Sequence, residues 1–432
     1  MGIINGWYEF LISLNDNYIT FFLILIFILN IYYWILHKKI NSFWDPFCLP
    51  FIFSACACSV VVYMYFVDLL FKIEYLYTFF MTEFAFLIGF LFIKSIDFSK
   101  INHNRSCSIH FNMYLYIIFS MIFLILQIFS WLLIGNPLQA SGSRLEFYNT
   151  GTGTFIIIIK AILPVLIWLI LDRFFYYKSN ILEKIYDFFV IICVFLSLIL
   201  SGAKSATLIF IYIMFFYKIY NKNINEKINK MIKYAFCYAI IGMFIVLAIE
   251  TNESNIIFLP IRFFLRLVAS GDIFTYVYSA NLFDVIKTNN FFVDIFSPLA
   301  AMLRLIEYEE VNKSIGQQIW NLFTEGNRGP NPRHNIFGIL YFGEFGGIIF
   351  SFIIGLLMSY IRNKLFYALS GNLILYFIYL ELYINVGSFL SGGLSMAISN
   401  IVSFCIINLL IFSPSYWIYS VLYKKGNLRW GN

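Results

Sequence analysis

About eleven stretches of roughly 20 apolar residues recur along this chain, and they constrain its fold more than any other feature. A helix of about 20 apolar residues is long enough to cross the ~30 Å hydrocarbon core of a bilayer. Of the 432 residues, 61% are hydrophobic and only 12% are charged, which excludes the surface of an ordinary soluble protein. The sequence therefore predicts an all-α polytopic membrane protein, with about 11 (10–12) transmembrane helices in a single integral membrane domain over residues 1–432. The predicted spans lie near 18–36, 47–67, 73–93, 111–134, 154–171, 186–200, 206–217, 233–249, 336–359, 366–386 and 394–413.

Lysine and arginine are distributed unevenly among the connections between these stretches. One set of connections carries most of them, including the five lysines from 218 to 233, whereas the short connections of the other set hold only Lys72, Arg144 and Lys204. Because basic residues are retained on the cytoplasmic side, this asymmetry predicts that the N-terminus and the long segment 250–335 lie outside. The same bias explains the net charge of +6, so no nucleic-acid partner is expected.

The segment 250–335 is too long for a connection without structure of its own, so we expect it to fold into helices that lie on the membrane. Arg262 and Arg266 make its apolar part a poor span, because each charge at the bilayer centre costs about 2.5 kcal/mol or more. An interfacial amphipathic helix after Pro260 is favoured instead. The two arginines are four residues apart and share one helix face. Paired guanidiniums suit a pyrophosphate, and anchoring at anionic headgroups is the alternative.

Two further cations stand alone in the short outer connections. Lys204, within Ser201-Gly-Ala-Lys-Ser205, lies on the outer side against the general bias, which indicates a functional demand. Arg144 either lines a polar cleft on the outer side or extends its side chain to the membrane surface.

The run Asn331-Pro-Arg-His-Asn335 joins the outer segment to the ninth span, which predicts that Arg333 and His334 lie at the membrane surface. Of the four histidines, His334 alone falls on the outer side. Imidazole is the side chain best suited to take a proton from a hydroxyl group near neutral pH, so we expect His334 to be catalytic or to contact the substrate. The alternative is a residue at the start of a helix with no chemical role.

The ninth span carries small residues at four-residue spacing, at Gly343, Gly347, Ser351 and Gly355. Such a stripe predicts the close approach of another helix. Glu344 beside the stripe is expected to form a buried structural pair, or to orient His334. The sequence has no phosphate loop, dinucleotide fingerprint, nucleophile elbow or metal-ligand cluster, so neither a metal nor another cofactor is expected.

The spacing of the spans, the Ser201–Ser205 element, the late outer segment with Arg262–Asp272, and the run Arg333–Gly347 resemble O-antigen and capsule repeat-unit polymerases. The wider group includes the O-antigen ligases of lipopolysaccharide biosynthesis. The resemblance implies a GT-C-like helical bundle with a large helical periplasmic or extracellular loop. It also implies a glycosyltransferase of the cell inner membrane that polymerises undecaprenyl-pyrophosphate-linked oligosaccharides. These lipids would be donor and acceptor, and a chain-length regulator is a further expected partner.

Carried onto this sequence, the resemblance makes His334 the catalytic base. Lys204 departs from the pattern, because that position is usually arginine, and lysine lacks the planar fork that grips pyrophosphate. An O-antigen ligase and a lipid-linked oligosaccharide flippase remain the alternatives. The resemblance places substrate-binding roles on Arg262 or Arg266 and on Lys204. In the expected mechanism Arg262, Arg266 and Lys204 hold the pyrophosphate, Arg144, Arg328 and Arg333 orient the glycan or the second lipid, and Tyr276 stacks on a sugar.

Overall fold

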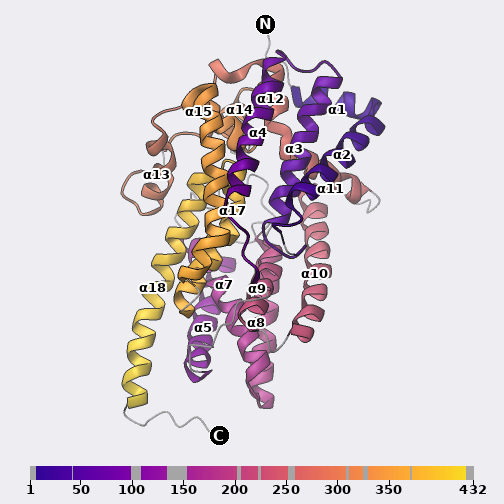
Figure 1. The fold of residues 1–432 in the computed structure, drawn as a ribbon. Coiled ribbons are helices and arrows are strands. Elements are labelled where there is room, and N and C mark those ends of the chain that lie inside the picture. Colours follow the sequence, from indigo (N-terminus) through magenta and orange to yellow (C-terminus); the bar gives the residue numbers. More distant parts are fainter. Residues whose placement is uncertain are drawn as a thin grey trace. The chain divides into compact units, whose positions relative to one another are not determined.

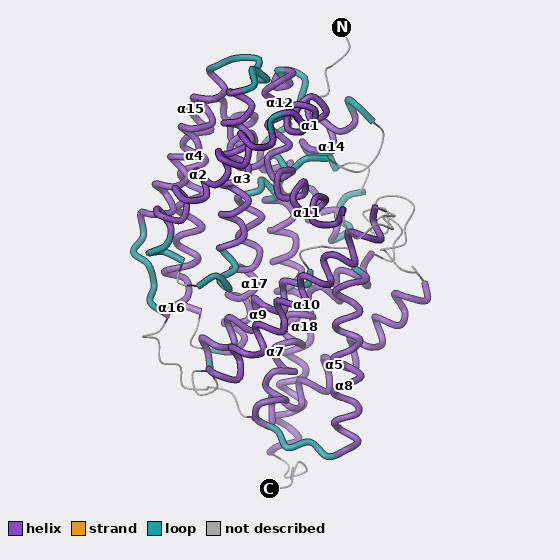
Figure 2. Tube along the Cα trace, turned by 90° about the vertical axis from the view of Figure 1, so that its right-hand side faces the viewer, coloured by secondary structure: helices purple, strands orange, loops and turns teal. Residues whose placement is uncertain are grey.

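Helices joined by loops make up the computed structural model, with no strand among the described residues (Figure 2). The structure describes residues 6–40, 42–98, 109–133, 153–201, 206–221, 225–251, 258–307, 311–324, 329–369 and 372–424. The first helices, labelled in Figure 1, are α1 (Gly6–Asp16), α2 (Tyr18–Leu36), α3 (Cys48–Phe66), α4 (Glu74–Phe92), α5 (Ile109–Leu133), α7 (Gly153–Tyr176), α8 (Ile181–Leu200), α9 (Leu208–Tyr220) and α10 (Asn225–Thr251). The later ones are α11 (Leu259–Val268), α12 (Asp272–Ala280), α13 (Phe291–Met302), α14 (Ile315–Asn321), α15 (Arg333–Tyr360), α16 (Phe366–Leu369), α17 (Leu373–Leu390) and α18 (Leu394–Lys424). Short 3-10 turns η5 (Ala269–Gly271) and η6 (Leu282–Asp284) and the π-helix η8 (Ile361–Leu365) complete the described part.

Nine helices in the described ranges are long and apolar enough to cross a membrane, so the chain is a multi-pass α-helical membrane protein. They cover nine of the eleven predicted spans. The other two predictions, 186–200 and 206–217, fall on α8 and α9. Helix α9 has 13 residues, which at 1.5 Å per residue is about 20 Å and too short for a whole crossing. Helix α8 is long enough to cross, but its first half contains three charged residues, Glu183, Lys184 and Asp187.

Large apolar side chains are exposed on the candidate spans, as expected where lipid covers them. On α2 the exposed fractions of Leu23, Phe27 and Trp34 are 64%, 66% and 76%. Such exposure would be costly in water, since burial of a side chain of this size contributes about 1.5–3 kcal/mol. The exposed apolar side chains and the helix lengths thus both indicate helices that span a membrane.

The chain divides into two compact units. The first contains Met1–Asp97, Pro260–Phe366 and Asn385–Ser399, and the second contains Phe98–Leu259, Tyr367–Ile384 and Asn400–Asn432. Most of the segment expected outside the membrane therefore belongs to the same unit as α1–α4.

Helices do form across 250–335, as predicted, but they do not all lie on a surface. Helix α12 is buried, with Tyr276 and Tyr278 among its covered residues. The turn η5 before it touches α3 so closely that a side chain on Gly271 would come within 2.9 Å of Ala57 Cα. The Ser270 hydroxyl also donates to the carbonyl of Phe53 at 2.9 Å. An amphipathic pattern identifies a helix but does not distinguish a lipid partner from another helix.

Helices α4 and α15 pack against each other through glycines (Figure 1). A Cβ on Gly89 would collide with the carbonyl of Phe352, and one on Gly355 would collide with the carbonyl of Phe86. The backbones can approach this closely only because both positions lack a side chain. The prediction that the small-residue stripe allows close helix approach is thus confirmed at Gly355.

Candidate functional site

Helix α15 is folded back on itself, and this turn creates the site. Gly343 has φ 71° and ψ −178° inside the element, a conformation that is not helical. On either side of it the backbones meet, because a Cβ on Gly338 would lie 3.1 Å from Gly347 Cα. The rings of Phe337 and Phe350 stack at 5.7 Å. Residues 333–342 therefore form a first arm, about 15 Å long at 1.5 Å per residue, which is half the thickness of a hydrocarbon core.

The fold-back brings His334 against the second arm and against α4. Its Nδ1 lies 3.0 Å from Ser351 Oγ, although the two residues are 17 apart in the chain. Its Nε2 lies 3.4 Å from Glu83 Oε2, which is longer than a formed hydrogen bond and leaves an electrostatic contact. The Phe86 ring stacks on the imidazole at 4.7 Å. The side chain of His334 is 0% exposed.

Glu83 is the centre of a buried polar network. Its Oε1 accepts hydrogen bonds from the Tyr32 hydroxyl at 2.5 Å and from the Ser54 hydroxyl at 2.7 Å. Its Oε2 accepts from Asn335 Nδ2 at 3.2 Å. Three helices, α2, α3 and α4, thus converge with the first arm of α15 on one carboxylate. Because a buried charge without partners is very costly, these hydrogen bonds offset the cost of burying the Glu83 carboxylate.

Arg333 supplies the cation beside this carboxylate. Its Nη2 donates to Ser54 Oγ at 2.8 Å, and Ser54 in turn donates to Glu83, so the hydroxyl bridges the two charges. The backbone N–H of Arg333 donates to the carbonyl of Ser391 at 3.0 Å. Its φ of 50° lies in the left-handed region, which costs a non-glycine residue about 1–2 kcal/mol. The residue is 2% exposed.

Arg333 and His334 are both buried among helices, so neither side chain is open to solvent, and their position at the membrane surface stays a prediction. Hydropathy treated 336–359 as one straight span. The reversal at Gly343 instead packs the start of α15 against its second arm.

The two arginines of α11 behave differently. Arg262 and Arg266 are both exposed, four residues apart on one face of an amphipathic helix, as the sequence predicts. The positive charge of Arg266 acts on the pKa of the Asp272 carboxyl group. Burial raises the pKa of Asp272 to about 7, and the nearby positive charges of Arg266 and Arg333 partly oppose that rise. The Asp272 carboxylate is thus near enough to both Arg266 and Arg333 for their charges to act on it.

Tyr276 lies in the same unit but presents no free ring face to a ligand. It is 5% exposed, and its ring lies 5.4 Å from that of Phe323. Burial and the Asp272 carboxylate raise its pKa to about 12. The remaining predicted site residues, Lys204, Arg144 and Arg328, lie outside the described residues.

Sequence reasoning missed Glu83 as the partner of His334. A carboxylate inside the apolar segment 73–93 was the available signal, since charges within spans are functional candidates. Glu344, which was expected to orient the histidine or to form a buried pair, is exposed next to the turn at Gly343. Nothing in one sequence reveals which helix faces which.

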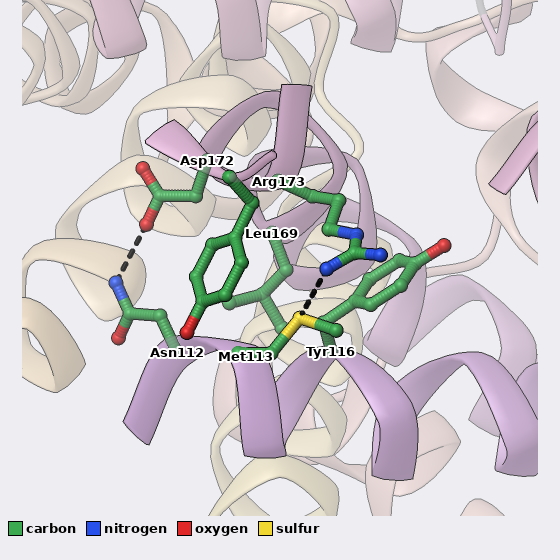
Figure 3. Close-up of a pocket in the computed structure, with 7 residues that line it drawn as sticks. Asn112, Met113, Tyr116, Leu169, Asp172 and Arg173 are labelled. Atoms are coloured by element: carbon green, nitrogen blue, oxygen red, sulfur yellow. Dashed lines mark hydrogen bonds between the residues drawn. The ribbon is translucent and has the colours of Figure 1, made fainter. Parts of the chain in front are cut away.

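The second unit holds a separate ionic cluster around Arg173. Its guanidinium pairs with Glu183 at 2.6 Å and with Asp187 at 3.0 Å. Beside it, Asn112 donates to Asp172 at 2.6 Å, and both residues line a cavity of about 10 Å³, the size of a single water (Figure 3). Arg173 thus neutralises carboxylates and joins α7 to α8.

Among the described residues, no group of three or more histidine, cysteine, aspartate or glutamate side chains is placed to hold a metal ion. The polar centre on α15 instead combines one carboxylate, one imidazole and one guanidinium, which are groups that move protons and bind anions.

The sequence matches no protein-family model and no curated protein, and the structure matches no solved structure. The class of protein therefore follows from the fold itself, a multi-pass helical membrane protein with a buried ionisable centre.

Proposed function

We propose that this protein is a membrane glycosyltransferase, which polymerises undecaprenyl-pyrophosphate-linked oligosaccharide repeat units into O-antigen or capsule polysaccharide. The reaction takes place on the outer face of the inner membrane. The observation that carries the proposal is the contact between His334 and Glu83 inside a membrane bundle, in the same compact unit as the exposed arginines of α11. Ionisable groups at such a position are costly and are retained for function.

The proposed chemistry is a single inverting displacement. An acceptor hydroxyl attacks the anomeric carbon of the donor glycan, and the bond from that carbon to the pyrophosphate oxygen breaks. His334 takes the hydroxyl proton as general base. Arg262 and Arg266, with Lys204, hold the pyrophosphate and stabilise its growing negative charge. The energy of the step comes from the lipid pyrophosphate, so neither nucleotide nor metal is required.

The fold proposed with this activity is a GT-C-like bundle of about eleven spans, in which α8 also crosses the membrane and the shorter α9 forms a partial span. Residues 250–335 face the periplasm or the exterior, and a chain-length regulator is the proposed protein partner. His334 is covered by Ser351 and Phe86 in this structure. The acceptor therefore has to displace that cover when it binds.

Burial of the charged centre favours a second candidate, a transporter of the same lipid-linked unit. Transporters place ionisable groups between helices in the membrane interior. Arg333, His334 and Glu83 fit that description, because all three are buried. The arginine pair of α11 fits an enzyme better, since both residues lie on an exposed helix face.

Gel analysis of surface polysaccharide after deletion of the gene separates these functions. A lipid core that carries one repeat unit, with no ladder, supports the polymerase. Accumulation of free lipid-linked polymer supports a ligase, and absence of repeat units from the outer leaflet supports a transporter.

Complementation with His334→Ala then tests the base. We expect loss of the ladder with normal protein level and membrane insertion. His37→Ala is the matched control, because that histidine is exposed in a loop, and it should restore the ladder. A normal ladder from His334→Ala would exclude the proposed chemistry.

A further inference from the structure

The two ring nitrogens of His334 face groups of opposite hydrogen-bonding character. Nε2 faces the Glu83 carboxylate, and Nδ1 faces the Ser351 hydroxyl. Tyr32, Ser54 and Asn335 each donate to that carboxylate, so Glu83 acts as an acceptor towards all three. A hydroxyl, in contrast, can donate or accept.

This asymmetry determines the position of the imidazole hydrogen. If Nε2 carried a lone pair, that lone pair would face carboxylate oxygen, and the two would repel. With hydrogen on Nε2, the same contact is attractive, and Nδ1 keeps its lone pair towards Ser351. A second group that orients a histidine through its other nitrogen commonly fixes the tautomer in this way.

The charged and titratable groups nearest to the imidazole come from three helices. Glu83 comes from α4, Arg333 from the first arm of α15, and Tyr32 from α2. Arg333 is directed to Ser54 and does not approach the imidazole through a hydrogen bond. Glu83 is therefore the group that orients the ring.

We propose that Glu83 is the positioning residue of His334, which holds the imidazole with hydrogen on Nε2 and leaves Nδ1 as the nitrogen that accepts a proton. The source of that proton rests on the proposed function, whereas the tautomer does not. During glycosyl transfer, the acceptor hydroxyl takes the place of Ser351 Oγ at Nδ1. Its oxygen bonds to the anomeric carbon, its proton passes to Nδ1, and the pyrophosphate leaves with the electron pair of the broken bond. Glu83 then balances the charge of the imidazolium.

Nitrogen-15 spectra of protein labelled at its four histidines test the tautomer without any activity. The signal that disappears in His334→Asn identifies His334. We expect the shifts of the tautomer with hydrogen on Nε2, and a change towards the other tautomer in Glu83→Gln. The inference is overturned if the wild-type signal belongs to the Nδ1–H tautomer, or if Glu83→Gln leaves it unchanged.

Steady-state chain extension with lipid-linked repeat units tests the consequence for catalysis. Glu83→Gln should lower kcat per folded protein by about 10–100-fold and leave KM unchanged, because the lost interaction orients the base. Glu83→Asp keeps the charge and should restore part of kcat. Glu74→Gln is the matched control, since it makes the same change at an exposed carboxylate on the same helix and should keep kcat near wild type.

A purely structural Glu83 would give a different pattern. Glu83→Gln and Glu83→Asp would both lower the amount of folded protein, while kcat per folded protein stayed at the wild-type value, and that result would overturn the inference. If wild-type protein extends no chain but the spectra are as expected, the proposed function fails and the positioning role of Glu83 stands.

Discussion

Replacing Gly343 by alanine tests the turn that carries His334 to Ser351. With φ 71° and ψ −178°, Gly343 occupies a region that is almost restricted to glycine, where another residue costs about 1–3 kcal/mol. A Cβ at this position meets no atom within 4 Å. The expected loss in the free energy of unfolding is therefore conformational strain alone, about 1–3 kcal/mol.

Two further glycines calibrate this value. Gly393 has ordinary φ, and a Cβ there makes only van der Waals contacts at 3.5–3.8 Å, so Gly393→Ala should be neutral or stabilise by about 0.4–1 kcal/mol. Gly392 has φ 75°, and its Cβ would lie 2.8 Å from Pro332 Cγ and 2.9 Å from Arg333 N. Gly392→Ala adds this collision to the strain, and should therefore cost more than Gly343→Ala.

Thermal unfolding in detergent, followed by the fraction that remains monodisperse, gives the order of the three variants. We expect Gly393→Ala to be at least as stable as wild type, then Gly343→Ala, then Gly392→Ala. A Gly343→Ala protein as stable as Gly393→Ala would refute the reversal of the chain at residue 343. His334 and Ser351 would then be separated by a continuous helix.

Two other predictions concern charged groups in the first unit. The pKa of Asp272 is about 7 when folded and 3.8 ordinarily, so the folded state binds more protons between these values, and stability should fall as the pH rises from about 4 to about 7. The loss in the free energy of unfolding is at most about 4 kcal/mol, at 1.36 kcal/mol per pKa unit. Asp272→Asn should reduce this pH dependence when unfolding temperatures are measured at pH 5 and pH 8. An unchanged pH dependence would contradict the assignment to Asp272. Asp45 and Arg362 form a pair at 2.6 Å with both side chains 0% exposed, so Asp45→Ala, which removes this carboxylate from the buried guanidinium, should destabilise by about 3–5 kcal/mol. The double variant Asp45→Leu with Arg362→Met should recover most of that loss in the same assay, and equal losses would count against the pair.

Hydropathy predicted most of the helices correctly, because the requirement to satisfy backbone groups in lipid leaves the helix as the simplest spanning element. It did not give the length or the direction of every helix. Helix α9 is apolar but has only 13 residues, and the apolar run after Arg333 contains a reversal that composition does not reveal. Gly343 is one of the four small residues in the stripe that predicts close helix packing. Gly355 of this stripe packs on α4, whereas Gly343 forms the turn.

The site was predictable by residue type but not by partner. His334 and Arg333 stood out because few polar residues interrupt an apolar chain. Glu83 was visible for the same reason, but its pairing depends on how α4 meets the folded arm of α15, and that contact joins residues about 250 apart. Long-range pairing of this kind has no periodic signature in a single sequence.

The hydrogen bond from the Arg333 amide to the Ser391 carbonyl connects two segments that are far apart in the chain. Because the amide of Arg333 donates to that carbonyl, and the adjacent Gly392 has no room for a side chain, substitutions at 391–392 should alter the polar centre around Glu83 through the backbone of Arg333. The effect of a substitution in one of these two segments should therefore depend on the residues present in the other. Substitutions in one segment are expected to be accompanied by compensating substitutions in the other.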